Sequence, residues 1–221
     1  MKFIIITKKK WDIKNFNNIK KNIFIFDEIN LIQIKKINPK IIFFIHWSKI
    51  IKESLFEKYL CIQFHASNLP KGRGGSPIQN QILQNIKKTK LTAFKISKKL
   101  DSGPICLQED LMLAGDAEQI LKKIEIKSIK MINKIIKIKK LKFKKQVGKP
   151  SYFKRRKPLE SRIDTSQILT IDKLYDFLRM LDAPGYPGAF IELNKFKFIF
   201  NNIKKINSKL SAEVIISINE K

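Results

Sequence analysis

The chain has 221 residues and a formal net charge of +27, from 46 lysines and arginines against 19 aspartates and glutamates, and 43% of its residues are hydrophobic. This apolar content supports a packed core, which excludes a disordered chain, and the length suits one substantial domain or a core with a small appendage. No apolar run reaches the roughly 20 residues of a membrane-spanning helix, and the short apolar run at the start lacks the features of a signal peptide. We therefore expect a cytoplasmic protein without a membrane contact.

The first third of the chain alternates short apolar runs with polar stretches. We predict strands at residues 3–6, 23–26, 41–45 and 62–65, and helices at 11–20, at 30–37 and from an N-cap at Ser48 to about residue 59. Unbroken apolar runs are typical of parallel strands buried on both faces. The expected fold is an α/β protein with an open, mostly parallel, Rossmann-like sheet and helices on both faces.

The rest of the chain is predicted to contain further helices and strands. A helix is predicted from Pro77 to about residue 85, strands at 91–97 and 104–113 flank a turn at Asp101, and Asp116 is predicted to cap a long helix. We divide the chain into an α/β core (1–145), an extended basic connection (146–170) and a small C-terminal appendage (171–221). The appendage is predicted to hold a helix (172–181), a rigid turn (182–190) and a β ribbon (196–200 and 213–218). An exposed ribbon edge can pair between two chains, so a homodimer is one expectation.

The basic residues point to nucleic acid only by their number. The excess is mostly lysine, spread from Lys8 to Lys221 without a single motif, so we expect nucleic acid not to be the primary partner. In a chain that otherwise uses lysine, an arginine favours planar, bidentate recognition of phosphate or carboxylate, or a buried ion pair. The arginines are Arg73, Arg155, Arg156, Arg162 and Arg179.

Several cofactor classes are disfavoured. No glycine precedes Gly72, so the glycine loops that hold a dinucleotide or a nucleotide triphosphate are missing after the first strand. Cys61 and Cys106 lie in apolar surroundings without metal-ligand spacing. We expect free buried thiols in a reducing compartment and no metal.

A candidate acid–base pair stands out. His65 ends a predicted strand and precedes a glycine-rich loop, and Asp101 lies on a tight Asp-Ser-Gly-Pro turn. Ligands of open α/β sheets bind beyond the carboxyl ends of the strands, where His46 also lies. A histidine and a carboxylate at this edge can move protons to and from a substrate.

The stretch from Gln63 to Pro70, with the sequence QFHASNLP, resembles the Asn-x-His-x-Ser-x-Leu-Pro motif of the formyltransferases that use 10-formyltetrahydrofolate. The turn at Asp101 is similar to the aspartate turn of that family, and the segments 152–158 and 186–190 resemble later parts of it. The resemblance covers most of residues 41–190. One position departs from it, because Gln63 stands where the family has a catalytic asparagine.

The resemblance implies roles for residues of this chain. His65, Asp101 and Gln63 would be catalytic: the imidazole and the amide would stabilise the oxyanion that forms on the formyl group, and the carboxylate would take the amine proton or set the protonation of the ring. Gln63 could instead be a scaffold residue. The contacts of the folate co-substrate would include His46, Trp47, Ile51 and Leu100, with Trp47 stacking on the pterin or belonging to the core. The contacts of the acceptor would include Lys71, Arg73, Arg155, Arg156 and Tyr186.

Three functions remain open on the sequence. The first is an N-formyltransferase acting on the amine of a nucleotide-linked amino sugar, the second a methionyl-tRNA formyltransferase, and the third a binding protein without activity on the same scaffold. The tRNA enzymes of the family carry a sizeable second β domain. The chain after Thr170 is short for such a domain, so we expect the sugar enzyme.

Overall fold

The computed structural model describes residues 1–8, 22–168 and 170–218, so the helix predicted at 11–20 lies outside the described residues. A six-stranded sheet with the order β2-β1-β3-β4-β6-β7 forms the core. The first four of these strands are parallel, and β6 is antiparallel to both of its neighbours. The predicted α/β fold with an open, mostly parallel sheet is confirmed. The strands are β1 (Phe3–Thr7), β2 (Ile23–Phe26), β3 (Ile41–Ile45), β4 (Leu60–His65), β6 (Lys88–Lys95) and β7 (Ile105–Met112).

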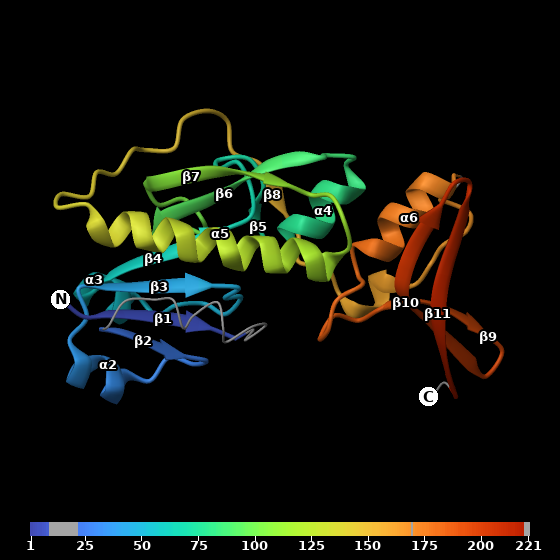
Figure 1. The fold of residues 1–221 in the computed structure, drawn as a ribbon, viewed down its shortest axis with the longest axis horizontal. Coiled ribbons are helices and arrows are strands. Elements are labelled where there is room, and N and C mark those ends of the chain that lie inside the picture. Colours follow the sequence, from blue (N-terminus) through green and yellow to red (C-terminus); the bar gives the residue numbers. More distant parts are fainter. Residues whose placement is uncertain (9–21, 169, 219–221) are drawn as a thin grey trace.

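Helices cover both faces of this sheet (Figure 1). Alternate residues of β1 and β3 pack into two separate apolar clusters, because successive strand side chains point to opposite faces. One cluster includes residues of α4 (Pro77–Leu83) and α5 (Ala117–Lys137), and the other includes residues of α2 (Leu31–Ile37) and α3 (Glu53–Lys58). Asp116 caps α5 as predicted, since its carboxylate accepts from the backbone N–H of Gln119 at 2.7 Å.

The predicted helix start at Ser48 is wrong. Helix α3 begins only at Glu53, with Lys52 as the N-cap, and residues 47–52 are not helical. His46 adopts the left-handed region (φ 51°), which turns the chain out of β3 before a helix can form. The segment 46–52 is therefore a loop at the carboxyl edge of the sheet, where it is placed to line a site.

The C-terminal part forms a separate antiparallel sheet, at the right of Figure 1. It has three strands in the order β11-β10-β9, namely β9 (Ala189–Leu193), β10 (Phe196–Ile206) and β11 (Lys209–Ile218), and α6 (Ile171–Arg179) packs against it. The predicted two-stranded ribbon thus lacked one strand. The connection before it also holds structure, a short strand β8 (Tyr152–Phe153) that pairs with β5 (Arg73–Gly74) and a 3₁₀ turn (Pro158–Ser161). β11 is an edge strand with exposed apolar side chains, and pairing between two chains stays a prediction.

Arg179 joins this C-terminal part to the core. Its side chain is buried, and its guanidinium donates to the carbonyls of Leu113 and Gly115 and pairs with Asp176 at 2.7 Å. Both carbonyls belong to the loop between β7 and α5. For this arginine, the buried ion pair is the correct alternative.

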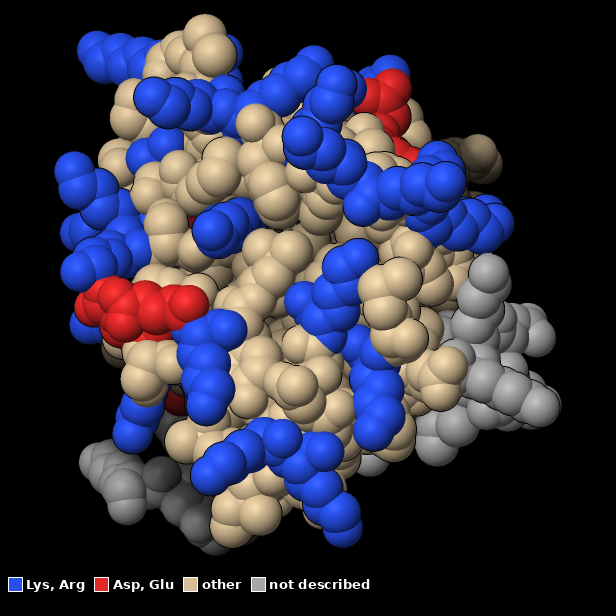
Figure 2. Space-filling model, turned by 90° about the vertical axis from the view of Figure 1, so that its left-hand side faces the viewer, with Lys and Arg blue, Asp and Glu red and all other residues tan. Residues whose placement is uncertain are grey.

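Positive charge covers much of the end of the molecule that lies opposite the C-terminal sheet. Figure 2 shows this end, with many lysine and arginine side chains and few acidic ones. The end of α5 and the loop that follows it lie there (Figure 1) and carry exposed lysines, including Lys137, Lys139, Lys140 and Lys142. Within the described ranges, no helix combines the length and the apolar character that crossing a membrane requires.

Candidate active site

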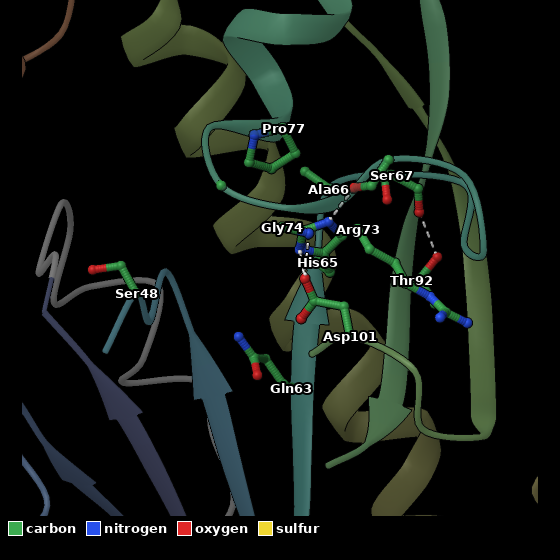
Figure 3. Close-up of polar contacts among 12 residues, drawn as sticks. Ser48, Gln63, His65, Ala66, Ser67, Arg73, Gly74, Pro77, Thr92 and Asp101 are labelled. Carbon is green, nitrogen blue, oxygen red and sulfur yellow. Dashed lines mark hydrogen bonds and ion pairs between the residues drawn. The ribbon is translucent and has the colours of Figure 1, made fainter. Parts of the chain in front are cut away.

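His65 and Asp101 meet at the carboxyl end of β4. The Nδ1 atom of His65 lies 3.7 Å from Oδ2 of Asp101, and both side chains are buried (Figure 3). The same carboxylate oxygen accepts from the backbone N–H of Gly74 at 2.8 Å. Asp101 adopts the left-handed region (φ 48°), so the turn is bent to bring its carboxylate to the histidine. The two residues that the sequence analysis singled out are thus brought together.

The contacts of His65 fix where its hydrogen lies. Its Nε2 is 2.8 Å from the carbonyl oxygen of Gly72, which can only accept, so Nε2 carries a hydrogen. In the neutral ring, Nδ1 would then present a lone pair to the Asp101 carboxylate, and the two would repel. A proton on Nδ1 would instead face the carboxylate with a favourable charge. A separation of 3.7 Å is too long for a hydrogen bond, so Nδ1 is the ring nitrogen with capacity left for a substrate.

Gln63 lies two residues before His65 on β4. Its half-buried amide donates to the carbonyl oxygen of Trp47 at 3.4 Å, a long hydrogen bond. Gln63 also lines the cavity that contains His65 and Asp101. The amide is thus near the pair and only weakly held.

The glycine-rich loop requires its glycines because another strand crosses it. Gly74 has φ 99°, and a Cβ there would lie 2.4 Å from the carbonyl oxygen of Phe153 on β8. This close approach lets β5 pair with β8 and aims the Gly74 N–H at Asp101. The backbone of this loop thus holds the Asp101 carboxylate.

A cavity of about 1110 Å³ opens beside the pair. Pockets for a single small ligand usually measure about 300–1,000 Å³, so this cavity has room for two reactants. All four residues predicted to contact the folate line it, which are His46, Trp47, Ile51 and Leu100.

The lining suits a flat aromatic ring with polar edges. Trp47 packs edge-on against Phe44 at 5.9 Å between ring centroids and belongs to an apolar core cluster, so its ring is a core element. Its buried Nε1 has no hydrogen-bond partner among the described residues. Apolar walls with a few free backbone and side-chain polar groups are the usual chemistry of a cofactor pocket.

Three residues predicted to contact the acceptor line the same cavity. They are Arg155, Arg156 and Tyr186. Arg155 donates to the carbonyl of Ser48 at 3.3 Å, and Arg156 lies over the ring of Phe177 at 5.8 Å. Burial lowers the pKa of the Arg156 guanidinium and raises the pKa of the Tyr186 hydroxyl. The two arginines place positive charge on the wall of the cavity, which suits an anionic group of a substrate.

The structure places the two other predicted contacts elsewhere. Lys71 lines a second cavity of about 520 Å³, whose lining includes neither His65 nor Asp101. The guanidinium of Arg73 points away from Gln63 (Figure 3) and donates to Oε1 of Gln146 at 2.7 and 3.2 Å. Its planar fork thus binds a side-chain amide of the chain itself. No motif in the sequence marks Gln146, which stands alone in a basic segment.

No group of three or more histidine, cysteine, aspartate or glutamate side chains suited to a metal ion occurs among residues 1–8, 22–168 and 170–218. Cys61 and Cys106 are free thiols, and burial raises the pKa of each to about 12.

Two family models match the chain. The model described as formyl transferase matches residues 9–134, more than half of the chain, and the model described as the C-terminal domain of methionyl-tRNA formyltransferase matches residues 158–217.

Similar proteins agree with these matches. The solved structure of methionyl-tRNA formyltransferase from Clostridium thermocellum is 40% identical, with a TM-score of 0.92 and coverage of 99% of both chains. The methionyl-tRNA formyltransferase of Thermodesulfovibrio yellowstonii is 29% identical over 85% of this chain and 65% of that protein. A 4-N formyltransferase from Francisella tularensis shares the fold at 18% identity, with a TM-score of 0.70 over 87% of this chain and 93% of that one.

In three other curated relatives, the region that matches this chain spans only between 27% and 38% of the length of the relative. Even so, the expectation that the chain after Thr170 is too short for a second domain of the tRNA-enzyme type is wrong. The C-terminal domain model of that enzyme matches there, and the Clostridium thermocellum structure matches over nearly its whole length. The missed strand β9 explains the error, because it turns an apparent ribbon into a three-stranded sheet.

Proposed function

The chain belongs to the formyltransferase family, and we propose that it transfers a formyl group from 10-formyltetrahydrofolate to the amine of methionine on methionyl-tRNA. The observation that carries this proposal is the 40% identity to the Clostridium thermocellum enzyme over 99% of both chains. The 4-N formyltransferase from Francisella tularensis shares only the fold at 18% identity. This ranking reverses the one that the sequence alone favoured.

The buried pair supports the chemistry of formyl transfer. When bound, the folate supplies an electrophilic formyl carbon. The oxygen of that group gains negative charge as the amine attacks, and a proton on Nδ1 of His65 can be donated to it. The Gln63 amide is a second donor, since its bond to Trp47 is long and easily given up.

The attacking amine must also lose a proton. The Asp101 carboxylate lies next to the ring, and only its Oδ2 is engaged by Gly74. It can accept that proton directly or through water. Collapse of the oxyanion then breaks the bond between the formyl carbon and the folate nitrogen, and the same proton can pass to that nitrogen, so tetrahydrofolate leaves and the formyl group stays on the amine. Positioned proton transfer of this kind contributes roughly 10²–10⁴-fold to a rate.

The charge of the chain also favours a tRNA acceptor. A net charge of +27 attracts a polyanion over long distances and speeds its association. Arg155 and Arg156 bring part of this charge to the cavity wall, where a phosphate of the acceptor end can be bound. Binding of this kind weakens steeply as salt is added.

A nucleotide-linked amino sugar is the second candidate acceptor. It is favoured by the same two arginines, because a sugar nucleotide also presents phosphates, and by the fold shared with a sugar N-formyltransferase from Shewanella. Binding without catalysis is a third reading, which rests on Gln63 in place of asparagine.

The test compares acceptors with one preparation of protein. Purified protein is supplied with 10-formyltetrahydrofolate and either methionyl-tRNA or a panel of nucleotide-linked 3-amino and 4-amino deoxysugars, and kcat/KM is measured for each. We expect turnover of methionyl-tRNA, with kcat/KM falling as salt rises. Turnover of sugars alone would establish the second candidate, and folate binding without turnover of either acceptor would establish the third.

A further inference from the structure

We propose that Gln146 is a positioning residue, which holds the Asp101 turn in the geometry that the acid–base pair needs. This inference rests on the proposed formyl transfer and concerns a residue with no motif of its own. Gln146 lies in the loop after α5, 45 residues along the chain from Asp101.

The contacts of the Gln146 amide account for all of its hydrogen-bonding capacity. Its Nε2 donates to the carbonyl oxygens of Asp101 and Gly103, both at 2.8 Å. Its Oε1 accepts two hydrogen bonds from Arg73, at 2.7 and 3.2 Å. A side-chain amide has two donor hydrogens and two acceptor lone pairs, so every one is used. The partners also fix the orientation of the amide, because carbonyls can only accept and a guanidinium can only donate.

These contacts hold the turn in place on both sides of the Asp101 carboxylate. Asp101 has a positive φ of 48°, a conformation that a residue with a side chain keeps only when its surroundings impose it. The Gly74 N–H holds the carboxylate itself at 2.8 Å, and Gln146 holds the backbone before and after Ser102. Without Gln146, the turn is free to relax and to carry the carboxylate away from His65.

Arg73 connects this grip to the acceptor side of the cavity. It neighbours Gly74 on β5, and its Nη1 donates to the hydroxyl of Tyr152 at 3.2 Å while the guanidinium lies 5.9 Å from the centre of that ring. β5 pairs with β8, and β8 leads directly to Arg155 and Arg156. The segment that presents the two cavity arginines and the turn that presents Asp101 are thus tied through one arginine–amide contact.

The substitution Gln146→Glu tests the grip with the least change of shape. A carboxylate keeps the acceptor for Arg73 but cannot donate to the two turn carbonyls, and it places negative charge against them. Gln146→Ala removes both functions. Gln33→Glu is the matched control, since Gln33 is exposed on α2, far from the cavity, and the charge change is the same.

We expect kcat for methionyl-tRNA formylation to fall by about 10–100-fold in both Gln146 variants, because a shift of about 1 Å in a reacting group can cost about 100-fold. The KM values for folate and tRNA should stay within about threefold, and the melting temperature should change little. Hydrogen exchange of peptides covering residues 100–104 should be about tenfold faster, as expected when hydrogen bonds that hold a segment are lost. The Gln33→Glu protein should match the wild type in all of these.

Two results would overturn the proposal. One is a Gln146→Glu protein with wild-type kcat. The other is a fall in kcat accompanied by faster exchange along the whole chain and a lower melting temperature, which would mark Gln146 as a general stability residue. If the wild-type protein turns over no acceptor, it is the proposed function that fails. Hydrogen exchange at residues 100–104 then tests the positioning role by itself. Faster exchange confined to this segment in Gln146→Glu supports the role, and unchanged exchange overturns it.

Discussion

Replacing Asp101 with asparagine removes one negative charge from the site while keeping its shape. Asparagine can still accept from the Gly74 N–H, and it tolerates the left-handed φ of 48° better than most residues. The carboxylate lies 3.7 Å from Nδ1 of His65, and both side chains are buried. The variant therefore isolates the electrostatic contribution of the carboxylate and its capacity to take a proton.

Coulomb's law gives the size of the effect. At the 3.7 Å separation and an effective dielectric constant of about 20, the attraction between a carboxylate and an imidazolium is about 4.5 kcal/mol. If that attraction acts fully in the transition state, its loss lowers the rate by about 10³-fold. This lies within the range of roughly 10²–10⁴-fold for positioned proton transfer.

The assay is steady-state formylation of methionyl-tRNA by the Asp101→Asn protein. We expect kcat to fall by about 10³-fold, with both KM values changed by less than a few-fold and an unchanged melting temperature. Asp116→Asn is the control, because asparagine caps a helix as well as aspartate does and Asp116 caps α5 outside the cavity. An Asp101→Asn enzyme that keeps more than a tenth of the wild-type kcat would refute the pairing of His65 with Asp101 as the catalytic unit.

Three further predictions follow from single features of the structure. Gln63→Leu should lower kcat by about 10²-fold, as loss of an oxyanion donor does. Gln63→Asn should keep kcat within tenfold of the wild type. A leucine variant with wild-type kcat would show that Gln63 is only a scaffold residue. Arg179→Ala leaves the carbonyls of Leu113 and Gly115 without their donor, while Asp176 keeps its ion pair with Lys87. At about 1–3 kcal/mol for each unsatisfied carbonyl, the free energy of unfolding should fall by about 2–5 kcal/mol, measured by urea denaturation. A loss below 1 kcal/mol would contradict its role in joining the two parts. Cys61 and Cys106 should resist alkylation of the native protein at pH 8. Burial raises the pKa of each thiol from 9.0 to about 12, which leaves about 1 thiol in 10,000 ionised at that pH. Rapid labelling without denaturant would contradict this prediction.

The strands of the core could be predicted because each is an unbroken apolar run. Residues 23–26 and 41–45 were bounded correctly, since parallel strands buried on both faces leave no other place for such runs. The helix start at Ser48 could not be predicted, because it depends on the left-handed turn at His46, and a propensity for capping does not reveal that turn. β9 was hidden for a similar reason: it follows directly on a turn rich in proline and glycine.

The acid–base pair could be predicted from motifs, but the contacts around it could not. His65 and Asp101 carry recognisable neighbours in the sequence, and the resemblance to a family gives them their roles. The partner of Arg73 is Gln146, 73 residues away, and only the folded chain brings an isolated glutamine to an arginine and a turn. For the same reason, the place of Lys71 and Arg73 in a loop predicts an acceptor contact, whereas in the structure Arg73 binds Gln146 and Lys71 lines a second cavity.

The most direct test of the account is a single-turnover reaction of the wild-type protein with 10-formyltetrahydrofolate labelled in its formyl group and an equimolar mixture of methionyl-tRNA and nucleotide-linked amino sugars. We predict that the label appears on the methionine amine, one formyl group for each folate consumed. Label found only on a sugar amine, or folate left intact beside both acceptors, would contradict the account.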